Sequence, residues 1–137
     1  MNRKIGTTIL LVAASCLGLS AQTLDLKANI PFNFQVGQVE MPSGEYHVSQ
    51  RNGVLTVRKT DGHPSSAMVL TMGETLSSPP ASGALIFNRY GNRYFLSSAR
   101  SPYSTEAQNL PKTRIEKEYA RAATERVETA SIPLRTH

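Results

Sequence analysis

Two arginines and two tyrosines near the centre of the chain are the side chains best suited to hold a ligand: Arg89, Tyr90, Arg93 and Tyr94. A guanidinium group binds anions through paired hydrogen bonds and also stacks on aromatic rings. Such a cluster could hold an anionic or sugar group. The same spacing also has a structural interpretation, which we favour, because each arginine can cover the tyrosine opposite it in a hairpin. The cluster is therefore a candidate surface binding site.

The remaining polar residues form no pattern typical of catalysis or of metal binding. The three histidines, His47, His63 and His137, do not have the spacing of a metal site with one another or with a carboxylate. Glu40 and Glu45 flank a turn, where carboxylates are usually solvated rather than paired for acid–base chemistry. No serine lies in a nucleophile elbow, and no glycine-rich loop precedes a helix. The sequence thus predicts no catalytic residue, no metal and no cofactor.

The first 21 residues have the features of a secretory signal peptide. Arg3 and Lys4 precede a mostly apolar stretch, and the small residue Ala21 stands at the expected cleavage position before Gln22. The apolar stretch is shorter than the ~20 residues that a membrane-spanning helix needs. An alternative is lipoprotein processing at Cys16, which would anchor the chain to a membrane. We expect an extracytoplasmic protein, periplasmic or secreted.

Cleavage would also change the composition of the chain. Cys16 is the only cysteine, so the mature protein would have no disulfide and no thiolate ligand. Loss of Arg3 and Lys4 leaves 13 basic and 10 acidic side chains and lowers the formal charge from +5 to +3. That mild balance does not indicate a nucleic-acid partner. The 137 residues suffice for one domain with an ordinary hydrophobic core.

The residues that follow show the period-two alternation of β-strands. Apolar residues occupy every second position from Leu24 to Val36, although Pro31 cannot donate to a neighbouring strand and indicates an edge strand or one broken there. Asn52-Gly53 is the turn signal of a hairpin that joins 45–51 to 54–59. Its expected register pairs Arg51 with Val54 and Val48 with Val57. A short strand is expected over 66–72 and is followed by a polar loop over 73–83. A second polar loop is expected over 100–111, after the central hairpin.

The stretch Ala84–Ala99 is predicted to be a second hairpin, with a type II′ turn at Gly91-Asn92. The expected cross-strand pairs are Tyr90–Arg93, Arg89–Tyr94, Phe87–Leu96 and Leu85–Ser98. Both of its faces carry apolar residues, so each face needs a cover. One face holds Ile86 and Phe95, and the other joins the core.

From Thr113 the period becomes that of a helix over 113–127, with Thr113 and Glu116 as a capping box. Its thin apolar stripe is the available cover for the second face of the hairpin: Ile115, Tyr119 and Ala122. Residues 128–137 show no pattern and are predicted to be a flexible tail. The order of elements predicts a single mainly β domain over 22–127, an antiparallel β-sandwich or small open barrel with one C-terminal amphipathic helix packed on it.

Four segments carry a resemblance to a known group of proteins: 27–34 (KANIPFNF), 41–46 (MPSGEY), 87–96 (FNRYGNRYFL) and the helix that contains Glu116. With them, the chain resembles small secreted proteins of unknown function that are numerous in Acidobacteria. These are turn and core patterns. The resemblance therefore implies a fold, but it implies no activity, cofactor or catalytic residue.

The sequence as a whole predicts an exported, non-enzymatic β-domain that acts in binding or as a component of the cell envelope. An envelope protein or polysaccharide is the expected partner, and the Leu24–Val36 edge strand could pair with a partner chain. Two alternatives stay open. One is a β-barrel that carries an apolar ligand in its cavity, and the other is a small hydrolase whose serine and glutamate residues meet only in the fold.

Overall fold

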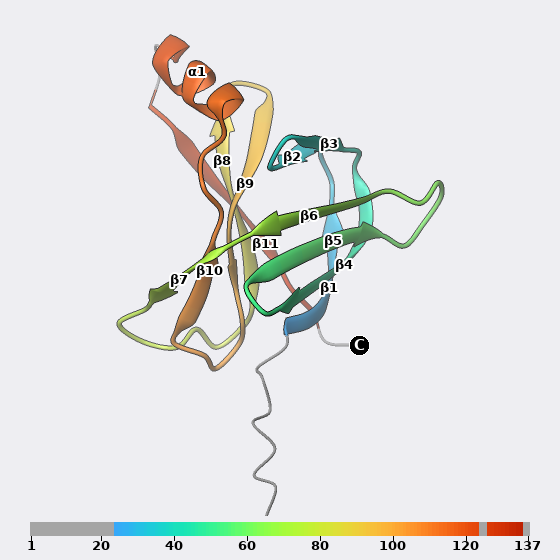
Figure 1. The fold of residues 1–137 in the computed structure, drawn as a ribbon, viewed down its shortest axis with the longest axis vertical. Helices are drawn as coiled ribbons and strands as arrows, with labels where there is room; N and C mark the ends of the chain where they lie inside the picture. The colour runs from blue at the N-terminus through green and yellow to red at the C-terminus, as the bar shows by residue number, and fades with distance from the viewer. Residues whose placement is uncertain (1–23, 124–125, 136–137) are drawn as a thin grey trace, which may run out of the picture.

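The computed structural model describes residues 24–123 and 126–135. They form a β-sandwich of two sheets with one short helix, as the order of elements predicted (Figure 1). The strand order keeps them as two separate sheets that do not close into a barrel. Within these residues, no helix is long and apolar enough to cross a membrane. The predicted signal peptide, with Cys16, lies outside the described residues.

The first sheet contains four antiparallel strands in the order β1-β4-β5-β6. Their bounds are Leu24–Ile30, Gly44–Arg51, Val54–Lys59 and Ser66–Leu70. The β4–β5 hairpin has the predicted register, with Arg51 opposite Val54. Asn52 and Gly53 take φ angles of 51° and 75°, and a type I′ turn requires positive φ at both of these positions.

The second sheet contains β11, β8, β9, β10 and β7 in that order, with β2 beside β9 and β3 beside β2. Their bounds, in chain order, are β2 Phe34–Val36, β3 Val39–Met41, β7 Met72–Thr75, β8 Ala84–Tyr90, β9 Arg93–Arg100, β10 Glu106–Asn109 and β11 Glu128–Pro133. The β2–β9 pair, Gln35 with Phe95, is parallel, whereas the other pairings are antiparallel. Only Thr71 separates β6 from β7, so a single extended segment provides an end strand of each sheet (Figure 1).

The predicted strand over 24–36 is divided at Pro31, where the missing N–H ends the pairing. β1 remains in the first sheet, and β2 crosses to the second. The apolar alternation continues through the break, because Ile30 and Phe34 are both buried in the core between the sheets. The Phe34 ring makes edge-to-face contacts with the Tyr46 and Phe87 rings, with centroids 5.1 Å and 5.4 Å apart.

The central hairpin, β8–β9, follows the predicted register only in its outer half. Gly91 takes a φ of 61° at the predicted turn, and the pairs from Tyr90–Arg93 to Phe87–Leu96 are as predicted. A bulge between Ile86 and Phe87 then shifts the register. The expected pair Leu85–Ser98 is therefore wrong, and Leu85 faces Ala99 instead. The shift places two buried apolar side chains opposite each other in the core.

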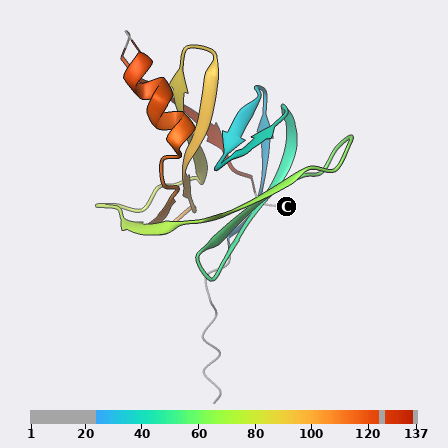
Figure 2. The same ribbon diagram turned by 45° about the horizontal axis from the view of Figure 1, so that its top comes forward.

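The helix, α1, spans Arg114–Ala122 and is shorter than the predicted 113–127. Thr113 is its N-cap as predicted, and the threonine hydroxyl accepts a hydrogen bond from the N–H of Glu116 at 3.2 Å. Ala123 ends the helix in extended backbone, with φ −69° and ψ 118°. Figure 2 shows α1 lying against the β8–β9 hairpin, on the side of the hairpin away from β6.

The prediction of a flexible tail over 128–137 is wrong for the residues that the structure describes. β11 pairs with β8 from Glu128–Arg89 to Pro133–Ala84, and Leu134 beyond it is buried. The inward side chains of β11, Ala130 and Ile132, are only partly buried, which is why the alternation is weak in the sequence. β10 likewise lies in the predicted loop over 100–111, because a four-residue strand is too short to show a period.

Candidate functional site

The four candidate residues lie at the tip of the β8–β9 hairpin but on two different faces, because successive strand residues point to opposite sides. Arg89 and Tyr94 belong to the face that continues into the core. The Tyr94 ring stacks on Phe32 with centroids 3.8 Å apart, and the Arg89 guanidinium lies 5.6 Å from the centre of the Tyr94 ring. Tyr90 and Arg93 lie on the opposite face, beneath α1. The hairpin thus separates the cluster into two pairs.

The structural interpretation of the cluster holds for one of the two pairs. Arg89 covers its cross-strand partner Tyr94, and its Nε also donates to the carbonyl oxygen of Gly91 at 2.8 Å. Arg93 does not cover Tyr90 as expected. Its guanidinium lies 5.6 Å from the centre of the Tyr119 ring of α1 instead. The reason is that the helix occupies the space above Tyr90, which is itself buried.

Glu116 is a buried carboxylate whose place in the fold the sequence did not reveal. Its side chain is 4% exposed, and Oε1 accepts hydrogen bonds from Asn88 Nδ2 at 3.1 Å and from the Tyr90 hydroxyl at 3.4 Å. Burial raises the pKa of Tyr90, and the Glu116 carboxylate raises it further. The Tyr90 hydroxyl is therefore kept protonated as a donor to Glu116. As a capping residue, Glu116 was expected to reach back along the helix rather than into the sheet.

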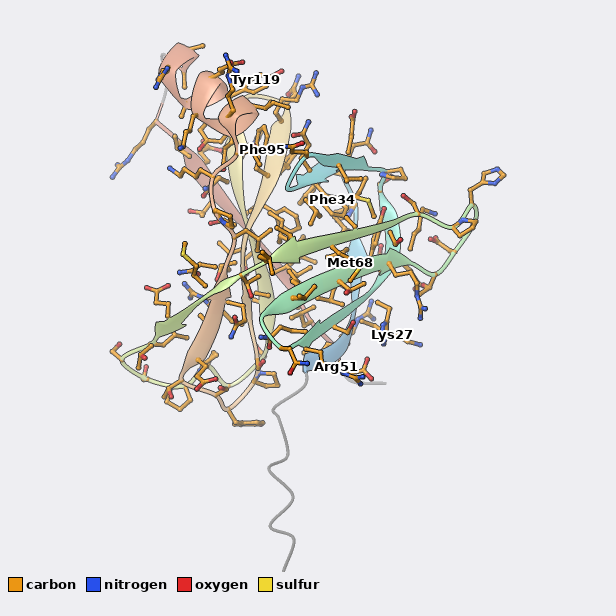
Figure 3. All side chains as sticks on the ribbon, viewed as in Figure 1. Lys27, Phe34, Arg51, Met68, Phe95 and Tyr119 are labelled. Carbon is orange, nitrogen blue, oxygen red and sulfur yellow. The ribbon has the colours of Figure 1, made fainter. Side chains whose placement is uncertain are left out.

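The helix covers the outer face of the hairpin, as predicted, but with a different stripe. The side chains turned towards the sheet are those of Glu116, Tyr119 and Ala120, whereas Ile115 is 40% exposed. The Tyr119 ring contacts Phe95 with centroids 5.8 Å apart (Figure 3). Of the expected stripe, Tyr119 is therefore confirmed, whereas Ile115 and Ala122 are exposed. Glu116, whose carboxylate has partners on β8, takes the place of the isoleucine on the inner face.

A pocket of about 470 Å³, here called the tip pocket, opens between the hairpin tip, the end of α1 and the start of β11. The residues that matter for its chemistry are Arg89, Tyr90, Tyr119, Arg126, Val127 and Glu128. Two of the four predicted site residues, Arg89 and Tyr90, therefore line it, while Arg93 and Tyr94 do not. Arg126 was not predicted as a site residue, because it falls within the surface helix expected over 113–127.

The tip pocket combines two cations with an aromatic wall. Arg89 is already engaged there, with Nη1 3.4 Å from Oε2 of Glu128. Arg126 is exposed and has no ion-pair partner among the residues that the structure describes. The half-buried Tyr119 ring borders the same space. Arginine with a neighbouring aromatic ring is suited to a flat or ring-shaped ligand that carries a carboxylate or phosphate.

The other candidate groups do not assemble into a site. His47 contacts Asp25 on the outer face of the first sheet, His63 is exposed, and His137 lies outside the described residues. Over 24–123 and 126–135, no three His, Cys, Asp or Glu side chains lie together so as to hold a metal ion. Glu40 and Glu45 are both exposed.

The geometry of the tip pocket is the basis for assigning a function. Comparisons of the chain with protein-family models, with curated proteins and with solved structures found no match. What the pocket can bind must therefore be inferred from the side chains that line it.

Proposed function

We propose that the protein is an exported, non-enzymatic binding domain of the cell envelope that holds an anionic sugar unit of a polysaccharide in the tip pocket. The observation that carries the proposal is the position of Arg126 and Tyr119 on one pocket of about 470 Å³. That volume falls within the roughly 300–1,000 Å³ of small-molecule sites. The signal-peptide pattern of residues 1–21 and the resemblance to small secreted proteins of Acidobacteria support the export.

Each part of the pocket has a role in this proposal. Arg126 binds the sugar carboxylate through two parallel hydrogen bonds, the geometry that guanidinium groups favour. The Tyr119 ring packs against the apolar face of the sugar, and Arg93 on that ring holds it in place. Glu128, 70% exposed at its side chain, accepts hydrogen bonds from sugar hydroxyls while Arg89 fixes its orientation.

The geometry favours binding over the two alternatives. A hydrolase would need a nucleophile beside the buried carboxylate, but Glu116 is held by Asn88 and Tyr90, and no serine is among the described residues that line the tip pocket. A carrier of an apolar ligand would need the enclosed cavity of a barrel. The two sheets here do not close into a barrel, and large side chains from both sheets are fully buried between them.

The test is a calorimetric titration of the protein with polygalacturonate, an acidic polysaccharide, and with uncharged dextran. Binding to polygalacturonate alone is expected, and it should weaken at high salt because exposed charges are screened. Arg126→Ala should weaken it by at least about tenfold, the effect of losing one charge-assisted contact of about 1.5–3 kcal/mol. Arg58→Ala is the matched control, since Arg58 is exposed on the outer face of the first sheet. Equal binding of both polysaccharides, or full binding by Arg126→Ala, would refute the proposal.

A further inference from the structure

Strand β6 leaves one row of backbone groups without a strand partner. The register with β5 and the flanking hydrogen bonds, Lys59 N to Ser65 O and Thr71 N to Gly53 O, show that odd-numbered residues of the strand pair with β5. In an antiparallel ladder, the alternate residues direct their N–H and C=O groups to the other side. Ser66, Met68 and Leu70 therefore present theirs at the edge of the first sheet, where β6 is the end strand.

The same edge carries exposed apolar side chains. Met68, labelled in Figure 3, lies on this strand. It is 71% exposed and Leu70 is 72% exposed, and Met72 continues the row into β7 at 63%. The sequence from Ser65 to Gly73 contains no charged residue and no proline. Edge strands that must stay unpaired usually carry lysine, proline or a bulge. β6 has none of these protections over Ser66–Leu70, so its edge is suited to receive another strand.

The opposite end of the first sheet is different. The outer side of β1 is occupied at Lys27, which exchanges two backbone hydrogen bonds of 2.8 Å and 2.7 Å with Arg135. The edge strand predicted from the sequence is therefore partly covered by the C-terminal segment. The open edge is β6.

We propose that β6 pairs antiparallel with β6 of a second copy of this chain, about a two-fold axis at Met68. This register places Met68 opposite Met68 and Ser66 opposite Leu70. Every outward N–H and C=O of Ser66, Met68 and Leu70 then has a partner, and the paired segment matches the length of β6. The two four-stranded sheets become one continuous sheet.

The side chains around this axis favour a second copy as the occupant. Met68 and Leu70 of both copies meet on one face as a cluster of directly opposite and diagonal neighbours. The nearest charged side chain on the outer face of β5 is Arg58, opposite Ser66. The two Arg58 groups would be separated by at least three strand spacings, about 14 Å. That distance exceeds the Debye length of about 8 Å at physiological salt, so their repulsion is screened.

Sedimentation velocity over a concentration series tests the pairing. The wild-type protein should associate to a dimer as its concentration rises, while Met68→Lys and Met68→Glu should each remain monomeric, because like charges would face each other across the axis. An equimolar mixture of the two variants should dimerise again, since residue 68 of one copy faces residue 68 of the other. Ile115→Lys, on the exposed face of α1, is the control and should dimerise like the wild type.

Several outcomes would overturn the proposal. A wild-type protein that stays monomeric at every concentration would refute the dimer, as would dimerisation of Met68→Lys at the wild-type concentration. A mixture that stays monomeric would refute pairing at Met68. If the dimer formed only when Met68→Lys was mixed with Leu70→Glu, residue 68 of one copy would face residue 70 of the other. The two-fold axis would then lie at Val69, and the proposed register would be refuted. Circular-dichroism melting at a concentration where the wild type is monomeric should give each variant the wild-type midpoint, because residue 68 is largely exposed.

Discussion

The hydroxyl of Tyr90 lies 3.4 Å from Oε1 of Glu116, and these side chains are only 6% and 4% exposed. The contact joins the last residue of β8 to the first turn of α1, and Asn88 adds a second donor to the same oxygen. Buried carboxylates need such donors, because an unpaired one loses its hydration without compensation. The helix is therefore fixed on the hairpin by a polar contact as well as by Tyr119 on Phe95.

Glu116→Ala should lower the free energy of unfolding by about 1–3 kcal/mol, since it leaves the donors of the half-buried Asn88 and the buried Tyr90 without an acceptor. Glu116→Gln keeps an acceptor oxygen and should cost less. The control is Glu118→Ala on the exposed side of the helix, where only an i,i+4 pair with Arg114 is lost and about 0.5 kcal/mol or less is expected. Urea unfolding of the three variants measures these differences. Equal losses for Glu116→Ala and Glu118→Ala would contradict the role given to Glu116.

The sequence predicted well those parts of the fold that depend on short-range signals. Asn52-Gly53 and Gly91-Asn92 specify their turns because few residues accept positive φ, and Thr113 caps the helix by a local hydrogen bond. The bulge that moved Leu85 to Ala99 could not be predicted, because it depends on which residues fill the core from the other sheet.

Only part of the candidate site could be predicted, because the rest also depends on contacts between distant parts of the chain. Arg89 and Tyr90 could be placed at the hairpin tip from the turn alone, and both line the tip pocket. Arg126 and Glu128 reach the pocket only because β11 pairs with β8. That pairing joins residues far apart in the sequence. Ala130 and Ile132 are only partly buried, so the apolar alternation from which the β11 strand could have been predicted is weak.

Leu134→Ala should show that the C-terminal segment belongs to the folded domain. Leu134 is 7% exposed, and its N–H donates to the carbonyl oxygen of Gly83 at 2.9 Å. Truncating a buried leucine typically costs about 2–5 kcal/mol. Ser131→Ala, at an exposed position of β11, should change stability by less than about 0.5 kcal/mol. Both are measured by urea unfolding. An unchanged midpoint for Leu134→Ala would instead favour a loosely attached tail.

Tyr46 should make the stability depend on pH in the alkaline range. Its side chain is buried and its hydroxyl donates to the carbonyl oxygen of Pro42. Burial raises the pKa of Tyr46 to about 12, with a smaller contribution from Asp61. In the unfolded chain the pKa is about 10.

Because the folded-state pKa of Tyr46 is the higher one, its contribution is complete below pH 10 and is lost as the pH rises from 10 through 12. The contribution is at most about 2–3 kcal/mol. Urea unfolding between pH 8 and pH 12 measures the loss. Tyr46→Phe has no group to ionise, so its stability should fall less over this range, although it starts lower by about 1 kcal/mol without the hydrogen bond. Parallel pH curves for the two proteins would contradict this prediction.

Gly91→Ala distinguishes the cost of an unfavourable backbone conformation from the cost of a steric clash at the hairpin tip. Nothing lies within 4 Å of where a Cβ of residue 91 would stand, so the substitution creates no clash. Its φ of 61° is nevertheless unfavourable for an L side chain by about 1–2 kcal/mol, and that amount should be lost in urea unfolding. Gly73→Ala is the matched control, because residue 73 also has open space but no positive φ. There, reduced freedom of the unfolded chain should leave stability unchanged or raise it by up to about 1 kcal/mol. Equal losses at the two positions would mean that the turn geometry of Gly91 does not determine the stability of the hairpin.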